Sequence, residues 1–166
     1  PVEGKGVVNG SRRKLELKPV TAKNGKQTLT GKIEAWGEIG LAVKGYDYMD
    51  NTSNIYGVKE ITLTADSQVI YHSNLDRFAF DETRYLNSFT DFEEWKEHRS
   101  FYMKSFVDPG NRLRFIESIN RGILTVDERT DRVLWKAQCV RLAFTRYDFF
   151  FILWIETSDL VHWDVA

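Results

Sequence analysis

The residues that most often hold a catalytic metal ion are few and scattered in this chain of 166 residues. Its histidines are His72, His98 and His162, and its one cysteine is Cys139. A catalytic zinc ion takes three protein ligands around an open position, and two of them often come from one short motif. No H-x-H, no HExxH and no close pair of histidines or cysteines occurs. The sequence predicts no metal site and no cofactor in this chain.

Motifs for nucleophilic or hydrolytic catalysis are also missing. No GxSxG, SxxK, GxxxxGK[ST] or GxGxxG is present. Cys139 lies in an alternating apolar segment, which is typical of a buried structural thiol. The carboxylates that could flank a glycosidic bond are adjacent pairs, for which a solvated surface is the expected role; these are Asp81/Glu82, Glu93/Glu94 and Asp127/Glu128. We expect no catalysis, and the alternative is a small glycan-acting hydrolase using carboxylates of residues 81–97.

A cluster of hard oxygen donors occupies the segment YDYMDNTSN, residues 46–54. Calcium uses such donors, which here are Asp47, Asp50, Asn51 and Asn54. Their spacing does not match a calcium-binding EF-hand loop, and clusters of Asn, Asp, Ser and Thr form turns without any ion. The segment therefore predicts a turn, with calcium binding as the alternative.

Aromatic residues make up 14% of the chain, which is enough to supply both a core and a binding surface. Flat rings stack on the apolar faces of sugars, and nearby Asp and Asn side chains can bind hydroxyl groups. The candidate binding residues are Trp36, Tyr46, Tyr48, Tyr56 and Trp95, with Tyr85 also available. Packing inside a β-rich core is the alternative role of these rings.

The segment LDRFAFDETRY, residues 75–85, combines charges of both signs with three aromatic rings. Charges that are taken out of water need partners, and this segment supplies them locally. We expect each aspartate to pair with the arginine that follows it, while Phe78 and Phe80 point inward. The residues predicted to pin this crossover between elements are Asp76, Arg77, Asp81, Arg84 and Tyr85. The predicted role is structural.

Hydrophobic alternation with a period of two recurs along most of the chain and predicts strands. Residues 56–66 and 67–73 predict a hairpin that turns near Asp66 and Ser67. Residues 81–100 break the pattern, and a capping box from Thr90 to Glu93 predicts one helix over about 90–98. Two long strands are expected over 132–144 and 146–156. The sequence predicts a single mostly β domain over 1–166, an immunoglobulin-like β-sandwich with one short helix.

Charge and hydropathy exclude some partners. The 23 basic and 24 acidic residues nearly cancel, so no nucleic-acid partner is expected. The longest apolar run is FFFILWI, residues 149–155, which is too short to span a membrane. A single cysteine cannot form an internal disulfide, which is compatible both with the cytosol and with an exported protein that lacks disulfides. The apolar strands over 137–166 are atypical because no glycine follows Gly122, and they predict a homodimer. A structural interaction protein that associates through its C-terminal strand is therefore a further alternative function.

Three segments carry a resemblance to a known family. They are AWGEIGLAVKGYDYMDNTSNIYGVKEITLTAD (35–66), LDRFAFDETRYLNSFTDFEEWK (75–96) and SFYMKSFVDPGNRL (100–113). Together they resemble the accessory β-rich domain that follows the catalytic domain in lysostaphin-type zinc metallopeptidases of certain Gram-negative bacteria. The most specific motifs are DRFAFDETRYLNS and GYDYMDNTSNIYGV, and the likeness covers about residues 10–130.

The resemblance implies a cell-envelope or periplasmic setting and hydrolysis of peptidoglycan peptide bonds by the complete protein. In that family the catalytic domain holds zinc through a histidine and an aspartate of one segment and a histidine of an H-x-H segment. This chain has no H-x-H and no segment resembling the catalytic domain. No catalytic residue is carried over. The implied role is a non-catalytic accessory module whose partner is a catalytic peptidase domain or peptidoglycan itself.

Overall fold

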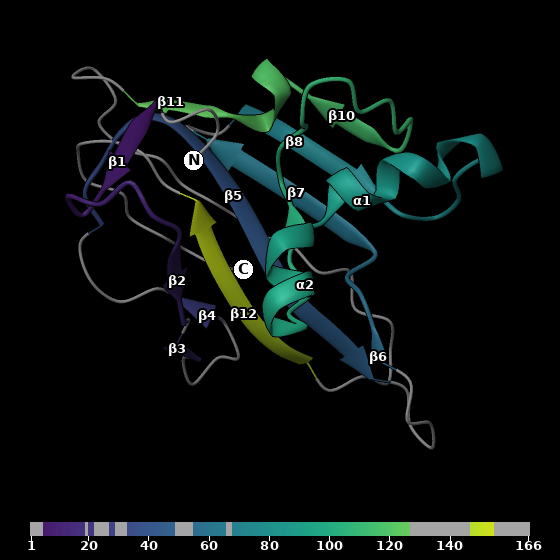
Figure 1. Ribbon diagram of the computed structural model, residues 1–166, viewed down its shortest axis with the longest axis horizontal. Helices are drawn as coiled ribbons and strands as arrows, with labels where there is room; N and C mark the ends of the chain where they lie inside the picture. The colour runs from purple at the N-terminus through teal and green to yellow at the C-terminus, as the bar shows by residue number, and fades with distance from the viewer. Residues whose placement is uncertain are drawn as a thin grey trace.

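The computed structural model of the protein describes residues 5–18, 20–21, 27–28, 33–48, 55–65, 68–126 and 147–154. Within these ranges strands dominate and the helices are short (Figure 1). The prediction of a β-rich chain is confirmed. The predicted strand over 132–144, the turn donors of 49–54, and both Cys139 and His162 lie outside the described residues.

The larger sheet is organised around one long strand, β5 (Ala35–Tyr48). All of the pairings that link its strands are antiparallel. The other members are β1 (Gly6–Val8), β2 (Leu15–Leu17), β6 (Ile55–Tyr56), β9 (Met103–Lys104), β11 (Leu124–Val126) and β12 (Tyr147–Trp154). A separate small ladder joins β3 (Val20–Thr21) to β4 (Gln27–Thr28).

The second sheet has the order β10-β8-β7. It consists of β7 (Glu60–Ala65), β8 (Gln68–Asn74) and β10 (Ile116–Ser118). β7 and β8 pair antiparallel, so the predicted hairpin is confirmed, with a register shift between Leu63 and Thr64. The turn itself, at residues 66–67, lies outside the described residues.

Both sheets contribute to one hydrophobic core. From β5 it includes the odd-numbered residues Ala35, Ile39, Leu41 and Val43, of which the last two are each 1% exposed. Ile61 and Leu63 of β7 and Tyr71 of β8 belong to the same cluster. Side chains alternate across a strand, so this period-two pattern sends the even-numbered residues of β5 to its other face. That second face carries Ala42, which packs with Tyr102 in a separate small cluster.

The helical part of the chain follows β8. It consists of η1 (Phe80–Tyr85), α1 (Leu86–Phe89) and α2 (Phe92–His98), and a later turn, η2 (Asn120–Gly122), precedes β11. The predicted helix over 90–98 corresponds to α2, whereas η1 and α1 were not predicted. Both elements are too short for a helical period of hydrophobic residues to be recognised in the sequence.

The predicted capping box at Thr90 is wrong by one residue. The N-cap of α2 is Asp91, whose carboxylate accepts the backbone N–H of Glu94 at 3.3 Å. Thr90 is extended and forms a β-bridge with Met103. Both residue types cap helices well, so the sequence alone did not separate them. The backbone pairing of Thr90 decides the position.

Part of the apolar strand β12 is paired with a neighbouring strand on each side. Phe151, Ile152 and Leu153 pair with β2 on one side and with β5 on the other. An interior strand has no free N–H or C=O row to offer to another chain, which limits edge-to-edge association over these residues. The remainder of the atypical segment, 137–146 and 155–166, lies outside the described residues. The predicted homodimer stays a prediction.

Candidate functional site

A cleft of about 670 Å³ lies beside the end of the three-stranded sheet. Its lining residues belong to β8, to the segment that joins β8 to η1, to η1 itself, and to the chain that leads into and forms β10. Figure 1 shows how β8 and β10 are arranged. The lining side chains that matter below are His72, Asp76, Arg77, Phe78, Arg114 and Glu117. Pockets of this size bind small ligands in many proteins, so the cleft is the candidate site.

One buried carboxylate fixes the geometry of this cleft. Glu82 is only 5% exposed, and it accepts three hydrogen bonds. The donors are the Ala79 N–H at 2.7 Å, the Arg114 N–H at 3.0 Å and the Arg114 Nε at 2.9 Å. The Arg114 guanidinium, followed by the two backbone donors, holds the pKa of Glu82 at about 2. Glu82 is therefore ionised at neutral pH and ties η1 to the residues before β10.

The arginine partner of Glu82 remains open to the cleft. The Arg114 side chain is 71% exposed, and one of its terminal nitrogens lies 3.8 Å from Asp81. Hydrogen bonding to Glu82 raises the pKa of Arg114. A guanidinium has five N–H donors, and Glu82 uses the one on Nε. Arg114 is thus held in orientation while its outer donors remain accessible.

The structure places the predicted loop residues in a different pattern of contacts. Arg77 Nε lies 3.6 Å from Asp76, as expected, but Asp76 also lies 3.3 Å from Lys59. Lys59 is the main cause that lowers the pKa of Asp76. The predicted pairing of Asp81 with Arg84 is wrong. Asp81 instead lies 3.8 Å from the Arg114 guanidinium.

Arg84 and Tyr85 contact each other, with the Arg84 guanidinium 5.1 Å from the centre of the Tyr85 ring. The cationic plane above the ring is a favourable arrangement. Tyr85 is half-buried against the main core. This pair sits at the end of η1, where the chain enters α1.

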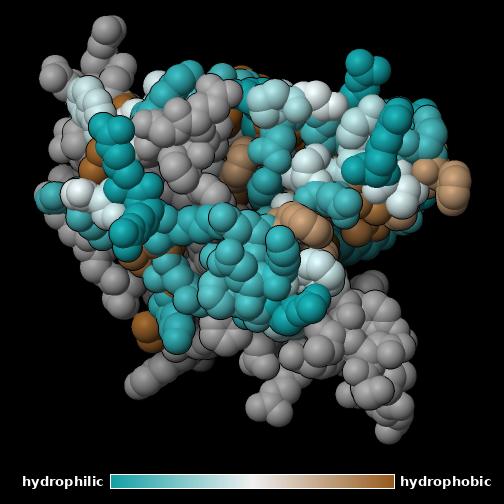
Figure 2. All heavy atoms as spheres, in the orientation of Figure 1, coloured by the Kyte–Doolittle hydropathy of each residue, from teal (hydrophilic) through white to brown (hydrophobic). Residues whose placement is uncertain are grey.

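The expectation that Phe78 and Phe80 point inward is wrong. Phe78 is 44% exposed and Phe80 is 95% exposed. Period-two alternation applies to extended strands, but β8 ends at Asn74 and a 3-10 helix begins at Phe80, so the alternation no longer holds there. Figure 2 shows hydrophobic side chains reaching the surface on the side where η1 and α1 lie. Phe78 lines the cleft, so its exposed ring adds apolar surface there.

The aromatic candidates for binding do not form one platform. Trp36 and Tyr46 lie on the same strand ten residues apart, which corresponds to about 33 Å. Tyr48 and Tyr56 belong to the paired strands β5 and β6, and only their backbones are described. Trp95 stacks on Phe92, with ring centres 5.7 Å apart, and the Arg99 guanidinium lies 4.9 Å from its ring. Trp95 is still 39% exposed and Phe92 49% exposed, so this pair is a separate exposed aromatic site on α2.

No protein-family model, curated protein or solved structure matches this chain. Within the described residues, no group of three or more His, Cys, Asp or Glu side chains is placed to hold a metal ion. Among the same residues, no helix is long and apolar enough to cross a membrane.

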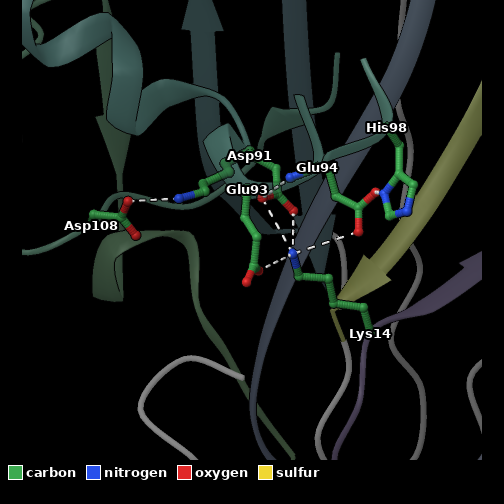
Figure 3. Close-up of polar contacts among 7 residues, drawn as sticks. Lys14, Asp91, Glu93, Glu94, His98 and Asp108 are labelled. Carbon is green, nitrogen blue, oxygen red and sulfur yellow. Dashed lines mark hydrogen bonds and ion pairs between the residues drawn. The ribbon is translucent and has the colours of Figure 1, made fainter. Parts of the chain in front are cut away.

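A second polar cluster surrounds Lys14 (Figure 3). Its ammonium lies 2.7 Å from Glu93, 3.0 Å from Asp91 and 3.7 Å from Glu94. His98 Nδ1 lies 3.0 Å from Glu94. Burial lowers the pKa of Lys14, but its bonds to Glu93 and Asp91 outweigh this, so the pKa is raised. The cluster links Lys14, the residue before β2, to α2. Its carboxylates Glu93 and Glu94 are one of the acidic pairs that the sequence suggested for a hydrolase.

The hollow next to this cluster, about 440 Å³, is lined by Lys14, Glu16, Glu94, His98, Ser100 and Tyr102. The Tyr102 hydroxyl donates to Glu16 at 3.1 Å, and Lys44 donates to the Ser100 hydroxyl at 3.1 Å. Burial and then Glu16 raise the pKa of Tyr102. These polar groups satisfy one another, which favours a structural role. The cleft beside η1, with its exposed guanidinium groups, is the stronger candidate.

Sequence reasoning missed the two residues that organise the cleft. Glu82 was noted only as one of an adjacent acidic pair, and Arg114 was not noted at all. Glu82 stands three residues after Ala79, at the spacing of a capping glutamate. Ala79 has no capping side chain, so the motif was incomplete, and the partner 32 residues away had no local signal.

Proposed function

We propose that this chain is a non-catalytic accessory module of a peptidoglycan metallopeptidase-like protein in the cell envelope. Its role is to position the catalytic domain or to bind envelope material, and the surface for that role is the side of the molecule that carries the cleft and the exposed rings of Phe78 and Phe80. We also propose that its two sheets form an immunoglobulin-like sandwich, which antiparallel pairing and a shared core support.

One observation carries the proposal. The motif most specific to the resemblance, residues 76–88, builds η1, and Glu82 inside it holds Arg114 at the edge of the cleft. A loop fixed by three hydrogen bonds to one carboxylate loses little conformational entropy when it binds. It presents two rings and a guanidinium, which are side chains enriched in binding surfaces.

The state of Glu82 supports a role without catalysis. A general acid or base works best when its pKa lies near the operating pH. With a pKa of about 2, Glu82 neither donates nor accepts a proton readily at neutral pH. Its three donors serve instead to keep the surrounding backbone in place.

The test uses the purified chain and isolated peptidoglycan sacculi. We expect the chain to sediment with sacculi at low and moderate salt, and we expect no peptide release with or without added zinc. The known zinc peptidase activity of a complete family member on the same sacculi serves as the positive control for release. Zinc-dependent release by this chain would overturn the non-catalytic role. Failure to sediment at either salt concentration would overturn wall binding and leave docking to a catalytic domain.

A further inference from the structure

The cleft beside η1 displays charges of both signs that are not fully used within the described part of the protein. Arg77 is 92% exposed and Arg114 is 71% exposed, so both present guanidinium N–H groups to solvent. Glu117 lines the same cleft on β10. Its carboxylate makes no hydrogen bond or ion pair with another described residue, whereas Asp76 and Glu82 each have a cationic partner.

From this arrangement we infer that the cleft binds a peptide that carries a free carboxylate and a free amino group close together. The inference rests on the proposed function, and it names the ligand class of that surface. A zwitterionic ligand satisfies both kinds of unused group at once. A ligand with one charge would leave the other group without a partner.

The carboxylate half of the ligand belongs at Arg114. A guanidinium forms two parallel hydrogen bonds with a carboxylate, provided that its plane is held in a suitable orientation. Glu82 provides that orientation from the buried side through Nε, at 2.9 Å. One outer nitrogen lies 3.8 Å from the exposed Asp81, so a ligand carboxylate would compete with Asp81 for it while Glu82 stays bonded at Nε. Arg77, which lines the same cleft, adds a second positive charge.

The amino half belongs at Glu117. This residue pairs with His72 in the ladder between β10 and β8, so the two side chains share one face of the sheet. His72 is already engaged, with Nδ1 3.1 Å from the Thr62 hydroxyl and 3.8 Å from Glu60. Glu117 is therefore the acidic group that remains for a ligand ammonium. Strand β10 holds its backbone, which fixes the site on regular structure.

Apolar groups complete the cleft. Phe78 and Phe115 line it, and Phe115 packs edge-to-face on Phe89 with ring centres 5.4 Å apart. The cleft volume of about 670 Å³ suits one or two amino-acid residues. A methylene chain that links the charged end of the ligand to the rest of the peptide would lie against these rings. The site thus fits a residue that carries an amino group and a carboxylate at one end of an apolar chain.

The probe for the test is the tripeptide L-Ala–γ-D-Glu–meso-diaminopimelate, whose last residue has a free amino group next to a free carboxylate. Binding to the full chain is measured by isothermal titration calorimetry. Two matched probes test the two signs of charge: the first removes the positive charge by acetylating that amino group, and the second removes the two negative charges of the last residue by amidating both of its carboxylates. We expect each change to weaken binding by about tenfold or more.

Variants assign each charge to its partner. Glu117→Gln should weaken binding of the parent tripeptide and leave binding of the acetylated probe unchanged, because the contact is already absent there. Arg77→Gln should weaken both the parent and the acetylated probe. The matched controls are Arg112→Gln and Glu97→Gln, which alter exposed charges away from the cleft. Thermal unfolding of every variant verifies that the fold is kept.

Equal binding of the parent and acetylated probes, or unchanged binding by Glu117→Gln, would overturn the inference. So would the absence of tripeptide binding at millimolar concentration. Sedimentation with sacculi tests the proposed function independently of tripeptide binding. Sedimentation without tripeptide binding would reject this ligand and keep the accessory role, whereas tripeptide binding together with zinc-dependent peptide release would keep the ligand and reject the non-catalytic role.

Discussion

The Glu82 carboxylate lies 2.9 Å from Arg114 Nε although 32 residues separate the two along the chain. The same carboxylate caps the backbone at Ala79. One side chain therefore holds the start of η1 and the approach to β10 together, and the cleft between them depends on it.

Replacing Glu82 by glutamine should lower the thermal midpoint by several degrees at neutral pH. The neutral amide still accepts a hydrogen bond, but it loses the charge that Arg114 and two backbone N–H groups stabilise. Circular dichroism melts measure the change. Asp81→Asn is the matched control, because Asp81 is 80% exposed and lies 3.8 Å from Arg114, so its effect should be near zero.

The difference in thermal midpoint between the native chain and Glu82→Gln should depend on pH, because Glu82 has a lowered pKa. The folded value of about 2 lies below the ordinary value of 4.5, so the carboxylate stabilises the fold above pH 4.5. This contribution is lost as the pH falls through about 2. The midpoints of the native chain and of Glu82→Gln should therefore converge between pH 4.5 and 2. A difference that stays constant down to pH 2 would contradict the assignment.

Replacing Lys14 by methionine should lower the free energy of unfolding by about 1–3 kcal/mol, since it removes the cation shared by three carboxylates. Urea unfolding at pH 7 measures the loss. Glu93→Gln should cost less than about 1 kcal/mol, because Glu93 is 67% exposed. If the two variants were equally destabilised, the buried Asp91 would not be the partner that matters.

Replacing Ser105 by alanine should leave the stability unchanged or raise it by up to about 1 kcal/mol. Ser105 is fully buried, and its hydroxyl has no hydrogen-bond partner among the described residues. The matched variant is Ser88→Ala, which removes a donor to the Tyr85 carbonyl at 2.9 Å and an acceptor for Asn111 at 2.8 Å. That variant should lose about 0.5–1.5 kcal/mol in urea unfolding. A large loss at Ser105 would mean that the hydroxyl has a partner.

Replacing Gly37 by alanine should lower the stability by about 2 kcal/mol or more. Its φ of 95° is unfavourable for a residue with a side chain. The added Cβ would also collide with the carbonyl oxygen of Lys5, the residue before the neighbouring strand β1. Gly110→Ala separates the two causes, because Gly110 has a φ of 83° and open space around its Cβ position. That control should cost about 1 kcal/mol, from the backbone alone. Equal losses in urea unfolding would contradict the steric contribution at Gly37.

Local patterns explain which parts of the fold were predictable. Alternation in Ile61 and Leu63 indicated β7 and its hairpin because side-chain period and burial agree there. The helix start was missed by one residue because the bridge from Thr90 to Met103 is a tertiary contact. Burial of Phe78 was predicted wrongly because the strand had already ended.

The candidate site was less predictable than the fold for a related reason. Its main contact joins two segments that are distant along the chain, and a charged residue has the same local appearance whether or not it meets a distant partner. The resemblance marked residues 76–88 as special. It did not indicate that Glu82, rather than either aspartate, would be the buried carboxylate.

Replacing Phe80 by alanine should separate binding from folding. The Phe80 side chain is 95% exposed, so its removal should change the free energy of unfolding by less than about 0.5 kcal/mol. If the η1 side is the contact surface, the same variant should reduce sedimentation with sacculi, because an exposed ring contributes most of its energy only when a partner covers it. Ile119→Ala is the control, as Ile119 is an exposed apolar residue, 50% accessible, beyond β10. Equal sedimentation of Phe80→Ala and the native chain would place the binding surface elsewhere, whereas a loss shared by both variants would indicate nonspecific hydrophobic adsorption.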